Sequence, residues 1–254
     1  AWEISRQDPD AVLVSLHADH AIEPLSAFME LIRGGVAAAG AKDALFTIAI
    51  PPTRPETGYG YIQPGEPLEL SEGLEGFTVR RFVEKPDAET ARDYVESGFL
   101  WNSGIFLWRA GFFLDQVKSV APELGDLIPL LEAGDVEEFF RSAPNISVDE
   151  AVLERSDQVA SLRATFQWDD VGAWEALART REPDGDGNVL LGAAEAVDSK
   201  DNIVMTEDGT VVLFGVEGLA VVRSGGVVLV ADRGRTPDLK KLLEALPPHL
   251  RDPK

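Results

Sequence analysis

The sequence predicts an α/β fold followed by a small β-rich domain, and the first hundred residues carry the clearest signals. Residues 11–16 (Ala-Val-Leu-Val-Ser-Leu) and 44–50 form short apolar runs, typical of strands buried on both faces. Between them, apolar residues recur at helical spacing over residues 24–39, and Gly40 ends the pattern. A strand, a helix and a second strand in this order predict a βαβ unit with a right-handed crossover.

Strand and helix patterns continue up to about residue 184. Residues 77–83 and 105–108 have the pattern of strands, and Ser147 with Glu150 forms a capping box at the start of a short helix. The remaining expected elements are helices at 87–96, 110–119, 122–132, 135–141 and 171–179, and strands at 158–162 and 164–167.

The segment Pro183–Asn188, rich in glycine and aspartate, is the strongest boundary signal in the chain. After it, short β-rich runs alternate with Gly, Asp and Ser turns, a spacing that fits a small sandwich, a barrel or a β-helix. These runs lie at 189–197, 202–205, 211–215, 219–223 and 227–231, and a helix at 236–245 follows them. We therefore expect an α/β domain over residues 1–184 and a small β domain with a final helix over residues 185–254.

The composition excludes several classes of protein. The chain has 254 residues, 23 Lys+Arg, 44 Asp+Glu and no cysteine, which gives a formal net charge of −21. A surface that binds nucleic acid needs a cationic face, and the lack of cysteine excludes disulfides, thiolate zinc sites and a cysteine nucleophile. No apolar run approaches the roughly 18 residues of a membrane span, and no signal peptide is evident. We expect a cytoplasmic protein that binds neither nucleic acid nor membranes.

Polar residues follow several predicted strands, where open α/β sheets bind their ligands. Asp19 comes shortly after the strand at 11–16 and is either a ligand residue or a helix-capping or turn aspartate. We expect His17 and His20 beside it to be structural or to support a ligand residue. Glu84 and Lys85 end the strand at 77–83; they can hold sugar hydroxyls and a phosphate, or form a surface ion pair.

Three further segments combine glycine or carboxylates with aromatic rings. Gly58-Tyr59-Gly60 allows a ligand to approach the backbone closely, although a β-turn before a hairpin is the better explanation of this motif taken alone. Asn102-Ser103-Gly104 precedes a predicted strand and is either a sugar-binding triplet or a simple turn. Between Trp168 and Trp174, Asp170 is either a helix cap or, with Asp19, part of an oxygen-ligand site that suits magnesium.

The order of these motifs resembles that of the sugar-phosphate nucleotidylyltransferases, in particular the mannose-1-phosphate guanylyltransferase branch. The resemblance covers most of the chain, including the β-rich tail. It is carried by Asp19-His20, Pro52-Thr-Arg-Pro-Glu-Thr-Gly-Tyr-Gly-Tyr61, Phe82-Val-Glu-Lys-Pro86, Trp101-Asn-Ser-Gly-Ile-Phe106, Ile146-Ser-Val-Asp149 and Trp168-Asp-Asp-Val-Gly172.

The resemblance implies a Rossmann-like nucleotide-diphospho-sugar transferase domain that converts GTP and mannose 1-phosphate to GDP-mannose and pyrophosphate, commonly as a homodimer. It implies that Asp19 and Asp170 bind a catalytic Mg²⁺ and that Lys85 binds the phosphate of the sugar. The residues it places at the sugar are Gly58, Tyr59, Gly60, Glu84, Asn102 and Gly104.

The sequence departs from the family pattern in three places. His17 stands where the family usually has proline, and Glu150 stands where it often has tyrosine. The glycine-rich, arginine-containing loop that cradles the nucleotide in this family has no counterpart here. We therefore expect an N-terminally incomplete domain that lacks about 60–100 residues, at roughly 30 per strand–helix unit. We expect this chain alone to be inactive and less stable than its parent. The alternatives are another hexose-1-phosphate nucleotidylyltransferase or a fragment that only binds sugar phosphate or nucleotide sugar.

Overall fold

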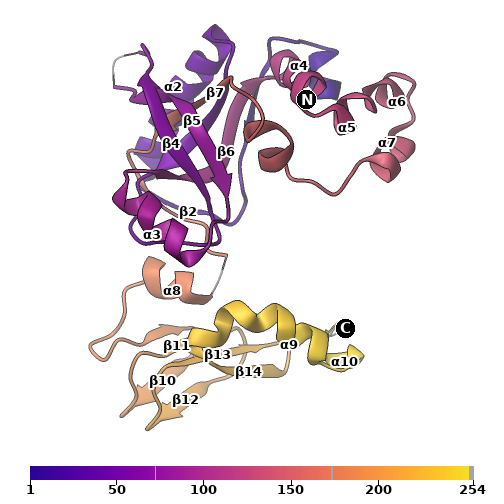
Figure 1. Cartoon of the computed structure of the whole chain (residues 1–254). Helices are drawn as coiled ribbons and strands as arrows, with labels where there is room; N and C mark the ends of the chain where they lie inside the picture. The colour runs from indigo at the N-terminus through magenta and orange to yellow at the C-terminus, as the bar shows by residue number, and fades with distance from the viewer. Residues whose placement is uncertain (72, 173, 252–254) are drawn as a thin grey trace. The chain divides into compact units, whose positions relative to one another are not determined.

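The computed structural model describes residues 1–71, 73–172 and 174–251, and it divides the chain into two compact units (Figure 1). The first unit contains residues 1–18 and 22–168, and the second contains residues 19–21 and 169–254. Ala173, inside the helix predicted at 171–179, and residues 252–254 of the predicted β domain lie outside the described residues. The two units are described separately.

The first unit is built on a six-stranded mixed sheet. Its strand order is β1 (Val12–Ser15), β6 (Leu100–Arg109), β3 (Leu45–Ile50), β7 (Val159–Arg163), β5 (Gly76–Glu84) and β4 (Gly60–Pro67). β1 and β3 both run antiparallel to β6 and are therefore parallel to each other, with helix α2 (Leu25–Ala41) connecting them. The predicted βαβ unit is confirmed, with β6 inserted between its strands. β1 is an edge strand of this sheet and is only partly buried, so the prediction that it is buried on both faces was wrong.

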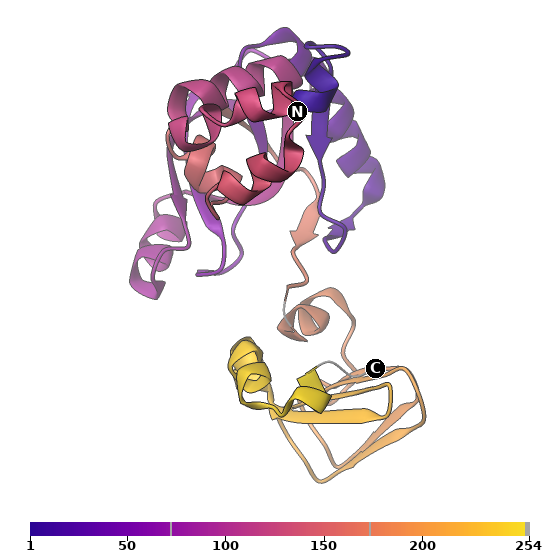
Figure 2. The same ribbon diagram turned by 90° about the vertical axis from the view of Figure 1, so that its right-hand side faces the viewer.

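The core occupies both faces of this sheet, as the alternation along β3 shows. Phe46 and Ile48 pack in one buried cluster with Phe28 and other residues of α2. Leu45 and Ala49 of the same strand pack in a second cluster, with the helices on the opposite face. Because strand side chains alternate between faces, a strand covered on both sides reads as one continuous apolar run. Figure 2 shows the two helical layers on either side of the sheet.

Shorter helices surround this sheet. They are α1 (Trp2–Ser5), α3 (Ala88–Glu96), α4 (Ala110–Val120), α5 (Pro122–Gly125), α6 (Ile128–Glu132), α7 (Val136–Ser142) and the π-helix η1 (Asp149–Leu153). The helix predicted at 122–132 is thus two short helices. The capping box is confirmed, since Glu150 N donates to Ser147 Oγ and Ser147 N donates to the Glu150 carboxylate. A separate two-stranded pair joins β2 (Ala21–Glu23) to β8 (Gln167–Asp169). In the described part of the chain, no helix has the length and apolar character needed to cross a membrane.

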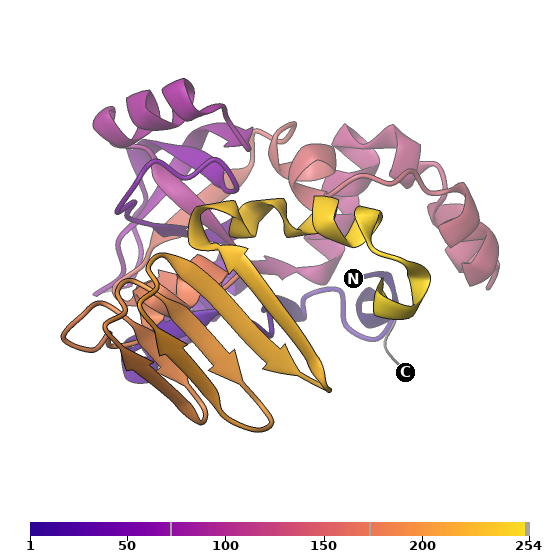
Figure 3. The same cartoon turned by 90° about the horizontal axis from the view of Figure 1, so that it is seen from below.

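The second unit is a stack of parallel strands in the manner of a β-helix (Figure 3). Val189 of β9, Ile203 of β11 and Ala220 of β13 are direct partners, so successive turns of the chain lie in register. β10 and β12 pair in parallel beside them, and β14 closes the order by running antiparallel to β13. The bounds are β9 (Val189–Leu191), β10 (Ala194–Val197), β11 (Ile203–Thr206), β12 (Val211–Phe214), β13 (Leu219–Ser224) and β14 (Val227–Asp232). Of the three architectures compatible with the sequence spacing, the β-helix is the one observed.

Helix α8 (Trp174–Thr180) belongs to the second unit, whereas the predicted boundary after residue 184 placed it in the first. The Arg233 guanidinium donates to both carboxylate oxygens of Glu175, at 2.8 and 3.0 Å, and so ties α8 to the 3₁₀ helix η2 (Arg233–Asp238). The hydrogen bonds of this pair raise the pKa of Arg233. This ion pair joins two elements within the second compact unit.

A buried asparagine pair holds the turns of the β-helix together. Asn202 is fully buried, and its Nδ2 donates to Asn188 Oδ1 at 2.9 Å and to the carbonyl of Val216 at 3.2 Å. Its Oδ1 accepts from the backbone N–H of Leu219 at 2.9 Å. One side chain thus satisfies polar groups from three consecutive turns.

Replacing this asparagine should destabilise the second unit. Asn202→Ala leaves buried donors and acceptors without partners, so we expect a loss of about 2–4 kcal/mol in its free energy of unfolding. Hydrogen exchange of the β11 and β13 amides measures this loss. Asn145→Ala, at an exposed asparagine of the first unit, is the matched control and should change stability by less than about 0.5 kcal/mol. Equal protection in the two variants would contradict the role given to Asn202.

Candidate functional site

Strand pairing in the first unit brings together three of the predicted site residues. Gly60 of β4 is the partner of Glu84 in β5, and the start of β6, which carries Asn102, pairs with both β3 and β4. A Cβ atom on Gly60 would lie 2.5 Å from Glu84 Oε2 and 3.4 Å from Asn102 Cβ. The contact between these segments therefore depends on a residue without a side chain at position 60.

Lys85 is held beside this cluster by its backbone and by its side chain. It lies just after β5 with φ of 47°, and its N–H donates to the carbonyl of Tyr59. Its Nζ lies 2.6 Å from Glu84 Oε1, and this hydrogen bond, together with the charge of Glu84, raises the pKa of Lys85. The Glu84 side chain is 18% exposed and that of Lys85 is 65% exposed. The ammonium group of Lys85 is therefore exposed to solvent, whereas the carboxylate that binds it is largely buried.

Asp149 completes the cluster, although we assigned it no role from the sequence. It opens the π-helix η1, and its Oδ1 accepts from Asn102 Nδ2 at 3.0 Å. Burial raises the pKa of Asp149 from 3.8 to about 6, and the nearby negative charge of Glu84 adds to the shift. The one sequence signal that could have found it is the motif Ile146-Ser-Val-Asp149, because nothing else relates positions 102 and 149.

An aromatic wall adjoins these polar groups. The ring of Tyr59 meets Trp101 and Trp168 edge to face, with centroids 5.2 and 5.3 Å apart. The guanidinium of Arg54 lies 5.0 Å from the Trp101 ring centroid and donates to Tyr59 Oη. Trp101 is buried, and its Nε1 has no hydrogen-bond partner among the described residues. Arg54 and Trp101 lie in two of the sequence motifs, but neither residue was predicted to belong to the site.

The two remaining glycines of the prediction are placed differently. Gly104 lies inside β6 with φ of 70°, and a Cβ atom there would come within 2.6 Å of His17 Nε2. Gly58 is exposed, and its N–H donates to Glu56 Oε1. Gly104 is thus packed against His17, and Gly58 is part of the loop that leads into β4.

The loop before β2 carries the first predicted metal ligand. Asp19 is exposed, and its carboxylate lies with the imidazoles of His17 and His20 in a group whose ligand atoms are all within 4.8 Å of one another. Imidazole and carboxylate together suit transition metals, whereas an all-oxygen set suits Mg²⁺. The three residues are neighbours in sequence, so their proximity is a property of the loop itself.

The two adjacent aspartates after β8 differ in their surroundings. Asp169 is buried and accepts two hydrogen bonds from Arg179, at 2.6 and 3.0 Å. Asp170 is only partly buried, and its Oδ1 accepts from Gly172 N at 3.3 Å. Asp19 and Asp170 belong to the same compact unit.

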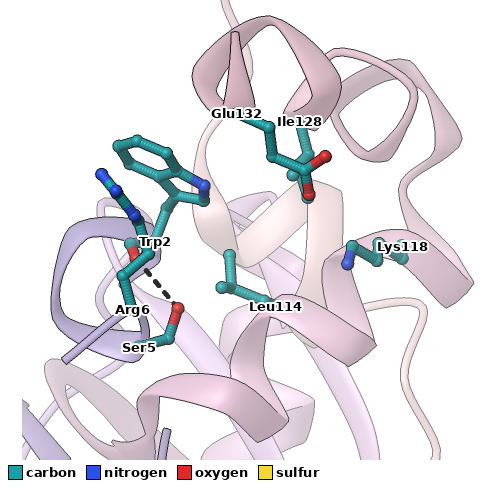
Figure 4. Close-up of a pocket in the computed structure, with 7 residues that line it drawn as sticks. All are labelled: Trp2, Ser5, Arg6, Leu114, Lys118, Ile128 and Glu132. Carbon is teal, nitrogen blue, oxygen red and sulfur yellow. Dashed lines mark hydrogen bonds between the residues drawn. The ribbon is translucent and has the colours of Figure 1, made fainter. Parts of the chain in front are cut away.

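A cavity of about 280 Å³ lies elsewhere in the first unit, where α1, α4 and α6 meet (Figure 4). Its lining combines the indole of Trp2 with the charged side chains of Arg6, Lys118 and Glu132. None of the site residues predicted from the sequence lines it.

The fold of the first unit and the order of these motifs agree with one known protein family. The nucleotidyl transferase family matches residues 1–186, and the chain belongs to this family. A second family, the MannoseP isomerase/GMP-like beta-helix domain, matches residues 192–246, in agreement with the parallel stack of the second unit.

Within this family, the chain is similar to proteins that are named for their action on mannose 1-phosphate. The chain is 37% identical over 249 residues to a mannose-1-phosphate guanylyltransferase of Escherichia coli, covering 94% of this chain and 52% of that protein. A mannose-1-phosphate guanylyltransferase of Salmonella muenchen is 36% identical with the same coverage. The solved structure of a mannose-1-phosphate geranyltransferase from Thermus thermophilus superimposes with a TM-score of 0.84 at 31% identity, covering 92% of this chain and 69% of that one. The chain spans about half the length of the curated relatives that it matches.

The raised pKa of Asp149 has a measurable consequence for stability. Because its folded-state pKa of about 6 exceeds the ordinary value of 3.8, the ionised carboxylate destabilises the fold at neutral pH. This destabilisation is relieved as the pH falls from about 6 towards 4. Asp149→Asn should therefore stabilise the chain more at pH 7.5 than at pH 4.5, by on the order of 2 kcal/mol. Urea unfolding at the two pH values measures the difference, with Asp157→Asn at an exposed aspartate as control. An NMR titration that places the Asp149 midpoint near 4 would refute the shift.

Proposed function

We propose that this chain is part of an enzyme that transfers the guanylyl group of GTP to mannose 1-phosphate, giving GDP-mannose and pyrophosphate. The observation that carries the proposal is the cluster of Gly60, Glu84, Lys85 and Asn102 at one place in the first unit, in a chain of the nucleotidyl transferase family. The relatives are mannose-1-phosphate guanylyltransferases, and they supply the choice of sugar phosphate and nucleotide.

In this proposal the cluster binds the sugar phosphate. Glu84 and Asn102 can accept from and donate to sugar hydroxyls, and the exposed ammonium of Lys85 attracts the phosphate. Tyr59 and Gly60 would line the sugar site, and the roles of Gly58 and Gly104 in sugar binding stay predictions. An oxygen of the sugar phosphate then attacks the α-phosphorus of GTP, the bond from that phosphorus to the bridging oxygen breaks, and pyrophosphate leaves. Positioning and charge neutralisation carry most of such a reaction.

We further propose that Asp19 and Asp170 hold Mg²⁺. Two carboxylates are the hard oxygen ligands that Mg²⁺ takes, and Asp19 and Asp170 belong to the same compact unit. The cation would neutralise phosphate charge on a chain of net charge −21. The imidazoles beside Asp19 are ligands for transition metals, so Mn²⁺ and Co²⁺ belong in every assay. A homodimer and a cytoplasmic location stay predictions.

An activity assay tests the reaction. The protein expressed from its complete reading frame should form GDP-mannose and pyrophosphate from GTP and mannose 1-phosphate with a divalent cation. Activity with only UTP or dTTP, or with only another hexose 1-phosphate, would favour a different nucleotidylyltransferase. Binding of sugar phosphate without turnover would favour the alternative of a binding module.

The same assay tests the role of Lys85. Lys85→Ala should lower kcat/KM by about a hundredfold, because a charged donor to the phosphate is lost. Lys118→Ala removes an exposed lysine of α4 and is the matched control. Equal activity of the two variants would remove Lys85 from the site.

Substitution of Gly60 should displace Glu84 without unfolding the protein. The added Cβ would lie 2.5 Å from Glu84 Oε2, the mobile end of a side chain, and 3.2 Å from Phe82 Cζ. Gly60→Ala should therefore weaken mannose 1-phosphate binding at least about tenfold, since about 1.4 kcal/mol corresponds to that factor. Gly40→Ala, whose Cβ would approach no closer than 3.8 Å to another residue, is the control. Calorimetric titration measures the affinity, and an unchanged value would contradict the role of Glu84.

A further inference from the structure

The side-chain amide of Asn102 is held from two sides inside the first unit. Thr47 Oγ1 donates to Asn102 Oδ1 at 2.7 Å, and Asn102 Nδ2 donates to Asp149 Oδ1 at 3.0 Å. Thr47 is fully buried and Asn102 is 9% exposed. These three residues come from β3, β6 and η1, so the network joins elements that are far apart in the sequence.

Thr47 also spans an irregularity in the sheet. It pairs with Phe106, yet Ala49, two residues further along β3, pairs with Asn102, so β6 bulges over residues 103–105. Thr47 Oγ1 lies 3.2 Å from the carbonyl of Ile105 as well as 2.7 Å from Asn102 Oδ1. One hydroxyl proton is shared between the two ends of the bulge. Bulges of this kind re-aim a side chain, and here the re-aimed side chain is that of Asn102.

The chemistry of the two partners permits one orientation of the amide. An ionised carboxylate only accepts, so it must face the N–H₂ group of Asn102. The Thr47 hydroxyl proton then faces Oδ1. A flipped amide would place its oxygen against the Asp149 carboxylate, where both groups are acceptors. In the observed orientation, one N–H and one lone pair of Oδ1 are not used by this network.

We propose that Thr47 and Asp149 are positioning residues that fix the amide of Asn102 in this one orientation, so that its second N–H and second lone pair serve a hydroxyl of the bound sugar. The identity of the ligand rests on the proposed function. Neither Thr47 nor Asp149 touches the sugar in this arrangement, and both act through Asn102. An amide that is already oriented loses less conformational freedom on binding, which favours affinity.

Matched variants separate the hydrogen bonds from the charge and from packing. Thr47→Val and Asp149→Ala remove one partner each and should raise the Kd of mannose 1-phosphate at least tenfold. Thr47→Ser keeps the hydroxyl, and Asp149→Asn keeps an acceptor oxygen, so both should stay within about threefold of the wild type. Ser161→Ala removes a different buried hydroxyl, one that donates to the Thr47 carbonyl at 3.2 Å, and should leave the Kd unchanged.

A double-mutant cycle tests whether the two residues act through Asn102. In an Asn102→Ala background, Thr47→Val and Asp149→Ala should have no further effect on the Kd, because the group that they position is gone. Full additivity of the effects would overturn the proposal. So would wild-type affinity in both single variants while Asn102→Ala loses binding, and in that case the proposed function stands.

A readout without ligand distinguishes failure of the inference from failure of the proposed function. The side-chain N–H₂ signals of Asn102, observed by NMR, should exchange slowly in the wild type, Thr47→Ser and Asp149→Asn, and fast in Thr47→Val and Asp149→Ala. Equal exchange in all five proteins overturns the positioning role, whatever the sugar phosphate does. The expected exchange pattern in a chain that binds no mannose 1-phosphate would uphold the orientation of Asn102 and refute the assigned ligand.

Discussion

The start of β6 is held between two strands, and the candidate site in the first unit depends on that placement. Trp101 pairs with Ile50 of β3 on one side and with Tyr61 of β4 on the other. β4 in turn pairs with the end of β5, where Glu84 lies. Backbone pairing thus fixes the distance between β4 and β6, which begin about 40 residues apart in the sequence. The positions of side chains on these strands are therefore fixed more precisely than those of side chains on a loop.

Acidic side chains also outnumber basic ones inside this cluster. Glu84 and Asp149 lie near one lysine, and burial together with the charge of Glu84 opposes ionisation of Asp149. Burial of such a carboxylate lowers the stability of the fold, whereas burial of a leucine at the same position would not. Its use is chemical, because an anion is the strongest available acceptor for the amide N–H of Asn102. Lys85 offsets part of the negative charge and leaves its ammonium exposed.

Much of this arrangement follows from local sequence signals, and the rest depends on contacts between distant residues. The end of β5 at Glu84 and the capping box at Ser147 were predictable, because each is encoded within a few residues. Asn102-Ser103-Gly104 was predicted to precede the strand at 105–108, as a sugar-binding triplet or a simple turn. The triplet instead lies inside β6, and Asn102 and Ser103 are buried. Its polar side chains are satisfied by partners such as Thr47, which lies 55 residues away and which no periodicity reveals.

The position of α8 shows the same limit. The glycine- and aspartate-rich segment after it looked like a linker, so α8 was assigned to the domain before it. One contact of α8 within the second unit joins Glu175 to Arg233, which lie 58 residues apart in the sequence. The roles of Asp19, Lys85 and Asp170 came from family resemblance, and their chemistry is open to the experiments above. Asp149 carried no assigned role because its partner in β6 becomes visible only when η1 is placed against the sheet.

The reversal of chain direction at β14 has a consequence for how the second unit can change in evolution. The parallel strands of the stack pair with the strands of the neighbouring turns, so the unit has the modular character of a solenoid. β14 runs antiparallel to β13 and ends the repeat, which prevents a further parallel turn from being added there. A new turn can instead be inserted between β11 and β13 and leave both ends of the stack as they are. The length of this unit is therefore adjustable from its middle, provided that each added turn supplies a side chain that does what Asn202 does.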